Sequence, residues 1–105
     1  MEVAAADVGV VTLPQTNLYL QARDVRTAQP RGLTAIRPLL DAGVTLAAGA
    51  DNLQDPFNLV GRADPMETAA LMVMAGHLLP AEAYHAVSAS SRAVMGLPQL
   101  SLIHI

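Results

Sequence analysis

Short apolar runs alternate along the chain with longer polar stretches and with segments whose apolar residues recur at helical spacing. Residues 8–13 form a nearly continuous apolar run that Pro14 stops, and residues 44–48 form a second run that Gly49 ends. Runs of this length without polar alternation are typical of strands that are buried on both faces of a parallel sheet. The sequence therefore predicts two short parallel strands.

The segment between the two runs predicts a loop and then a helix. Residues 15–31 are largely polar and end in proline and glycine, which is typical of a long loop. The apolar residues between positions 33 and 40 share one helical face, and Gly43 is placed to end that helix. The order strand, loop, helix, strand is that of a β/α unit followed by the next strand.

The part of the chain after the second run predicts a loop and three helices. Asp64 and Pro65 are suited to the N-cap and first position of a helix, with Glu67 placed for a capping box and Gly76 as the end. Because residues 69–75 are apolar nearly all round, we expect this helix to be buried. The methionines at positions 66, 72, 74 and 95 are expected to fill the core. Residues 80–87 and 90–95 predict two short helices, the second capped by Ser90 or Ser91, and residues 2–7 resemble the end of a helix.

A carboxylate follows the second predicted strand almost directly. Asp51 lies in the segment Gly49-Ala50-Asp51-Asn52, and Asp55-Pro56-Phe57 follows as an expected turn. Loops at the carboxyl ends of strands are where α/β barrels place catalytic and metal-binding groups. From the residues alone, Asp51 is equally suited to an Asx turn or a helix cap, and Phe57 to packing within its loop. The pattern indicates a site without deciding between these roles.

Composition narrows the class of protein. The chain has 105 residues, whereas a complete (β/α)₈ barrel needs about 250. A net charge of −3 with six Lys and Arg gives no basic stripe, so we expect no nucleic-acid partner. The sequence contains no cysteine, no apolar stretch of bilayer-spanning length and no signal peptide, so we expect a cytoplasmic protein without a membrane partner.

Several segments together resemble the C-terminal part of cytosine deaminases of the amidohydrolase superfamily. The most specific is the Gly-x-Asp-Asn-x-x-Asp-Pro-Phe cluster at residues 49–57, whereas residues 81–97 resemble terminal helices common to many amidohydrolases. The remaining segments are Val10-Val11-Thr12-Leu13-Pro14, Thr16 to Gln21, Arg31-Gly32-Leu33-Thr34 and Ala42-Gly43-Val44. The resemblance implies the fold class α/β: the last two β/α units and the terminal helices of a metal-dependent-hydrolase (β/α)₈ barrel, incomplete in this chain.

The resemblance also implies a reaction and roles for three residues. The reaction is hydrolytic deamination of cytosine to uracil and ammonia by water activated on one divalent metal ion, iron or zinc. Asp51 matches the family's metal-binding and proton-accepting aspartate, and Asn52 matches a substrate-binding position where the family often has a second Asp. Phe57 matches an aromatic residue, commonly Trp, that lines the substrate pocket. Other cyclic amidines, creatinine-like compounds or N-substituted triazines are alternative substrates.

The family's remaining catalytic groups are absent from the sequence. The chain has no His-x-His pair, no paired glutamate for general acid work and no third histidine ligand, so we expect the chain alone to be inactive and to retain no metal. Residues 1–99 are thus interpreted as the C-terminal part of an amidohydrolase barrel domain. Whether the full-length enzyme is a homo-oligomer is left open. The alternative from another class is a non-catalytic small α/β interaction domain.

The last six residues depart from the family. Residues 100–105 resemble the translation of a transposon end sequence used in DNA-library preparation, and we expect them to be a non-native tail. They are left out of the prediction of the fold and the site.

Overall fold

A computed structural model describes residues 2–100, although not the side chain of Glu2. The expected tail therefore falls, beyond Leu100, outside the described residues. Helix α1 (Glu2–Ala5) precedes strand β1 (Val10–Thr12), which is followed by α2 (Pro14–Leu20) and α3 (Ile36–Asp41). Strand β2 (Leu46–Ala48) then leads to α4 (Pro65–Met74), α5 (Pro80–Ala86) and α6 (Ala89–Val94). The predicted strands and helices occur in the predicted order, and α2 is an additional helix that was not predicted.

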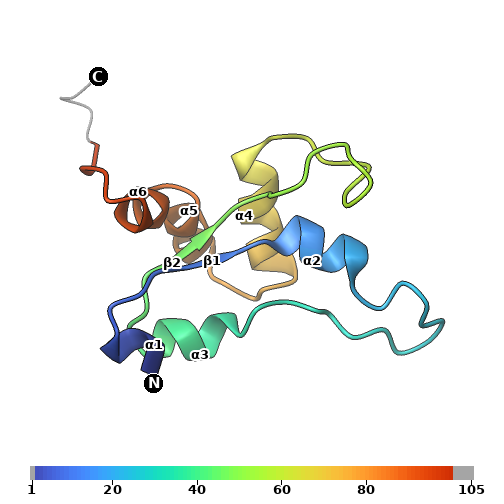
Figure 1. The fold of residues 1–105 in the computed structure, drawn as a ribbon, viewed down its shortest axis with the longest axis horizontal. Coiled ribbons are helices and arrows are strands. Elements are labelled where there is room, and N and C mark those ends of the chain that lie inside the picture. Colours follow the sequence, from blue (N-terminus) through green and yellow to red (C-terminus); the bar gives the residue numbers. More distant parts are fainter. Residues whose placement is uncertain (1, 101–105) are drawn as a thin grey trace.

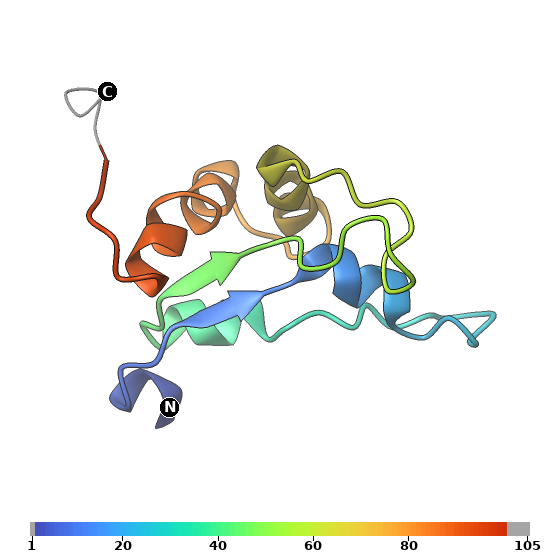
Figure 2. The same cartoon turned by 45° about the horizontal axis from the view of Figure 1, so that its top comes forward.

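The two strands are parallel, as predicted, and pair residue by residue from Val10 with Leu46 to Thr12 with Ala48. Figures 1 and 2 show α3 on one side of the strand pair and α4, α5 and α6 on the other. Both strands run toward the end of the molecule where α2 and the loop of residues 49–64 lie. The polar groups that follow each strand are therefore brought to one edge of the sheet.

The core lies between β2 and the helices around it. Met72 of α4 is completely buried, and the three residues of β2 are all buried. The remaining members come from α3, α4, α5 and the segments that connect them: Ile36, Leu39, Val44, Ala69, Leu78, Ala83 and Ala86. Small side chains make up much of this set because the strands and helices approach closely. An alanine at Gly76, for example, would place its Cβ 2.7 Å from the carbonyl oxygen of Met72.

Several helix ends follow the predicted residues. The Asp64 side chain accepts a hydrogen bond from the backbone N–H of Met66 at 2.9 Å, and Pro65 occupies the first turn of α4. Gly43 has a φ of 81° immediately after the C-cap of α3, a left-handed conformation that glycine adopts without steric cost. Gly96 ends α6 in the same way, with a φ of 71°.

Four local expectations were wrong. The polar segment 15–31 begins with α2 rather than a loop, because Pro14 is suited to the first turn of a helix that then continues to Leu20. α4 is buried on one face rather than all round, and Met66, Met74 and Met95 are exposed instead of filling the core. Neither Ser90 nor Ser91 caps α6, since both lie inside that helix. Glu67 faces Arg62, with 3.7 Å between Oε2 and Nε, instead of forming a capping box.

Candidate active site

The candidate site is built on the loop of residues 49–63, which follows β2 at the carboxyl edge of the sheet. Asp51 lies three residues beyond β2 and is exposed, with a backbone φ of 64°. This left-handed conformation is uncommon for residues other than glycine, although Asp and Asn adopt it more readily than most. Such conformations persist where the surrounding structure holds them, and they cluster at functional sites.

Thr16 of α2 holds the backbone on both sides of Asp51. Its hydroxyl donates to the carbonyl of Ala50 at 3.2 Å and accepts from the backbone N–H of Asn52 at 3.4 Å. Thr16 is 8% exposed, because α2 starts directly after β1 and its first turn packs against the loop. Thr16, which follows β1 in the sequence, therefore positions Asp51, which follows β2.

Asp55 joins the other two predicted site residues. Its carboxylate accepts from the Asn52 side-chain amide at 2.8 Å and from the backbone N–H of Phe57 at 2.9 Å. The N–H of Asn58 donates to the same carboxylate at 3.1 Å, and residues 55 and 58 also form a bridge. The Asn52 amide, followed by these backbone donors, holds the pKa of Asp55 below its ordinary value. The predicted turn at Asp55-Pro56 is confirmed.

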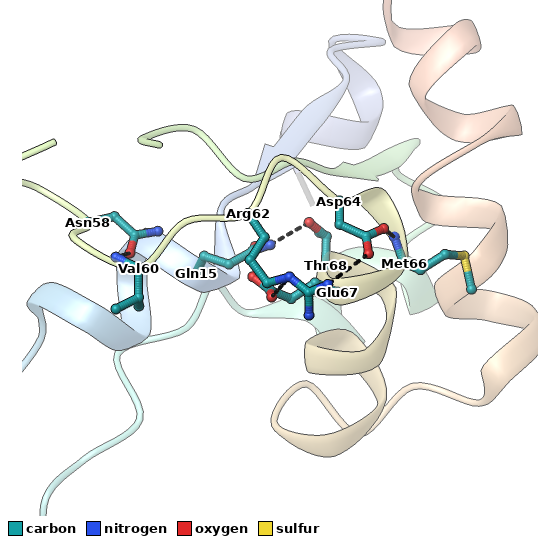
Figure 3. Close-up of polar contacts among 8 residues, drawn as sticks. All are labelled: Gln15, Asn58, Val60, Arg62, Asp64, Met66, Glu67 and Thr68. Carbon is teal, nitrogen blue, oxygen red and sulfur yellow. Dashed lines mark hydrogen bonds and ion pairs between the residues drawn. The ribbon is translucent and has the colours of Figure 1, made fainter. Parts of the chain in front are cut away.

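Asn58 completes the network from inside the loop. It is 2% exposed, and its side chain donates to the carbonyl of Asn52 at 3.3 Å and accepts from the backbone N–H of Val60 at the same distance. Figure 3 shows Asn58 beside Val60. An asparagine side chain thus replaces the backbone pairing that this irregular segment lacks. Neither Asn58 nor Thr16 stood out in the sequence, because their partners lie in backbone geometry that no local pattern encodes.

The three predicted site residues occupy different environments. Asp51 is exposed at the edge of the sheet, whereas the Asn52 amide is held by Asp55. The Phe57 side chain is 57% exposed, and its backbone is the part that the network fixes. The structure brings Asn52 and Phe57 together through Asp55 and places Asp51 beside them along the loop.

Asp51 is suited to supply one ligand to a metal ion, since a carboxylate oxygen is a ligand of divalent cations such as zinc. Within residues 2–100 no three His, Cys, Asp or Glu side chains gather as a complete metal site would require. The described residues therefore fit one position of a metal centre, and further ligands would have to come from elsewhere.

The chain is similar in sequence and in fold to parts of longer known proteins. No protein-family model matches the chain. Pterin deaminase from Rhizobium rhizogenes (strain K84) is 38% identical over 106 residues, which include 98% of this chain. In sequence, this chain is similar to a deaminase. The chain spans only 24% of the length of that relative.

Solved structures show the same fold within a longer chain. Crystal structures of 5-methylcytosine deaminase from Klebsiella pneumoniae, liganded with 5-fluorocytosine and with phosphonocytosine, match 90% of this chain with a TM-score of 0.80. The sequence identity is 20%, and the match spans 24% of the deaminase chain. The small α/β fold of residues 2–100 thus corresponds to about a quarter of a larger deaminase, which is consistent with part of a barrel.

Within residues 2–100 none of the helices has the length and hydrophobicity needed to cross a bilayer.

Proposed function

We propose that this chain is the C-terminal part of a metal-dependent deaminase of the amidohydrolase superfamily, with Asp51 as a metal ligand and proton acceptor. The observation that carries the proposal is the similarity to pterin deaminase along 98% of the chain, combined with a carboxylate at the carboxyl edge of the parallel strands. On this proposal residues 1–99 belong to one barrel domain. The reaction is hydrolysis of a ring C–NH₂ bond: water adds to the carbon, ammonia leaves and the ring keeps an oxo group.

The residues of this chain supply positioning and proton transfer in the proposed reaction. A divalent metal ion, when bound, would activate the attacking water. Asp51 would bind that ion through one carboxylate oxygen and take up the proton of the attacking water with the other. Thr16 fixes the backbone on either side of Asp51, so the carboxylate starts from a defined main-chain position. Preorganisation of this kind lowers the reorganisation needed in the reaction.

The substrate is proposed to be an amino-substituted pyrimidine ring, either alone or fused in a pterin. Cytosine fits the resemblance of the Gly49-to-Phe57 cluster, and a pterin fits the relative with 38% identity. Both rings carry the exocyclic amino group that the reaction removes. Phe57, with more than half of its side chain exposed, is available to contact the ring face, and Asn52 to contact a polar edge.

The proposal is tested in a chimera in which residues 1–99 replace the matching quarter of the Rhizobium rhizogenes pterin deaminase. We expect metal-dependent release of ammonia from a pterin or from cytosine, and its loss in the Asp51→Asn variant. An Asp7→Asn variant, which changes an exposed carboxylate before β1, is the matched control. A folded chimera that retains full activity with Asp51→Asn would refute the role of Asp51.

A further inference from the structure

A cavity whose lining does not include Asp51 lies between α2, α4 and the end of the 49–63 loop. Its volume is about 610 Å³, within the range of roughly 300–1,000 Å³ that small-molecule sites occupy. Leu18, Leu71 and Val60 give it apolar walls, and its polar lining comes from Gln15, Tyr19, Arg23, Asn58 and Glu67. The cavity therefore combines an apolar body with a few polar groups, as ligand sites do.

Gln15 contributes a buried polar atom that has no partner. The residue is 8% exposed, and its amide nitrogen donates to the Thr68 hydroxyl at 2.6 Å (Figure 3). Its amide oxygen, also buried, has no hydrogen-bond partner among the residues that the structure describes. A buried acceptor without a partner is destabilising, so this oxygen favours a donor that approaches it.

Glu67 adds a carboxylate with unused hydrogen-bonding capacity. It lies in the first turn of α4, with 27% of its side chain exposed. Arg62 approaches from the loop, but its Nε lies 3.7 Å from Oε2 of Glu67, longer than a hydrogen bond. Arg62 is itself 68% exposed and lies 4.0 Å from Asp64, so it is free to move aside (Figure 3).

Arg23 does not make the cavity a site for anions. Its guanidinium stacks on the Tyr19 ring, 3.8 Å from the centroid, and its Nε donates to the Tyr19 carbonyl. These contacts hold the charge of Arg23 at the exposed rim. The other two polar groups that argue for a ligand are both hydrogen-bond acceptors. They are the Gln15 amide oxygen and the Glu67 carboxylate.

We propose that this cavity binds a small planar amidinium compound with an apolar ring. The two N–H groups on one edge of an amidinium would donate one to each acceptor, and the charge-assisted bond to Glu67 would be the stronger of the two. The ring would lie against Leu18 and Leu71. The site uses neither Asp51 nor a metal, so the proposal is independent of the proposed deaminase activity.

Benzamidine is the probe, titrated into the ¹⁵N-labelled 105-residue chain and followed by NMR. We expect saturable shifts of the Gln15 side-chain amide and of backbone amides in α2 and α4, with a Kd of about 1 mM or lower. Glu67→Gln should weaken binding about tenfold, because a charged acceptor becomes neutral. Arg62→Gln should strengthen it, because the competing cation is removed.

Two controls separate the cavity from ordinary surface attraction. Neutral benzamide should bind at least tenfold more weakly than benzamidine, and Asp51→Asn should leave benzamidine binding unchanged. Gln15→Met tests the buried amide, and Glu67→Gln keeps the test decisive if that core variant unfolds. Absence of saturable shifts, shifts confined to Arg62 and Glu67, or unchanged affinity in Glu67→Gln would each overturn the proposal.

Discussion

Replacing Thr16 by valine should release the backbone that holds Asp51 in its left-handed conformation. The substitution replaces the hydroxyl of Thr16 with a methyl group, and valine keeps the branched shape of threonine. The hydroxyl bonds to the carbonyl of Ala50 at 3.2 Å and to the N–H of Asn52 at 3.4 Å, one on each side of Asp51. Both bonds are lost together in Thr16→Val.

The size of the effect follows from these two bonds. A typical hydrogen bond contributes about 0.5–1.5 kcal/mol net. Both distances exceed the usual ranges for O–H···O and N–H···O hydrogen bonds, and Ala50 and Asn52 are half-buried, so water can replace part of each bond. We therefore expect a loss of about 1–2 kcal/mol in the local stability of the loop. This corresponds to a factor of about 5–30 in the population of the open loop.

The assay is amide hydrogen exchange under native conditions, read at the backbone N–H of Asn52. Exchange through local opening reports the free energy of that opening. Thr16→Val should lower the protection of Asn52 by about 5- to 30-fold, whereas Thr16→Ser, which keeps the hydroxyl, should restore most of it. Thr45→Val is the matched control, because Thr45 is an exposed threonine just before β2.

Equal protection of Asn52 in the wild-type chain and in Thr16→Val would refute the reasoning. An equal loss of protection in Thr45→Val would also refute it, because the effect would then be a general response to losing a threonine near β2.

Three further predictions concern the core, an ion pair and the metal. Met72→Ala should lower the free energy of unfolding by about 2–5 kcal/mol in urea denaturation, since Met72 is completely buried; a smaller loss would show a core that collapses around the gap. Arg37 and then the Leu79 N–H lower the pKa of Glu82 to about 2, so the stabilisation from Glu82 is complete above its ordinary pKa and is lost as the pH falls toward about 2. Urea midpoints of the wild-type chain should therefore fall more steeply with acid than those of Glu82→Gln, and parallel pH curves would contradict this. The isolated chain should retain no iron or zinc after dialysis and release no ammonia from cytosine, because Asp51 alone cannot hold a transition metal; stoichiometric metal would contradict this.

The sequence predicted the fold best where local chemistry alone determines the structure. The two apolar runs became the paired strands, and Asp64 and Gly43 act at helix ends as expected. The prediction was wrong where the outcome depended on packing. Residues 15–20 belong to the segment predicted as a loop, yet they form α2 because one side of that helix is covered by the 49–63 loop and α4. Met74 looked suited to a core but is exposed, since only one face of α4 is covered.

The site could be predicted only as a position along the chain. The run that ends at Gly49 places Asp51 at the edge of a sheet, and this needs no tertiary information. The residues that fix the loop either lie far from it in the sequence or bond to backbone atoms whose positions the sequence pattern does not indicate. Thr16 lies 34 residues from Ala50, and Asn58 acts through the backbone carbonyl of Asn52. No periodicity marks such residues, because they bond to main-chain atoms of Ala50, Asn52 and Val60, which every residue type carries.

The exposed surface of the strands distinguishes the two remaining interpretations of the chain. Within residues 2–100 the sheet has two strands, so each keeps an unpaired edge. Val8 and Val11 are 54% and 48% exposed on and beside β1. A stand-alone interaction domain would be expected to cover or charge such edges, since unpaired apolar edges promote aggregation. A barrel would instead cover them with its neighbouring strands, and under the proposed function these strands would also bring the further metal ligands. The unpaired strand edges therefore favour the proposed deaminase barrel over an independent domain.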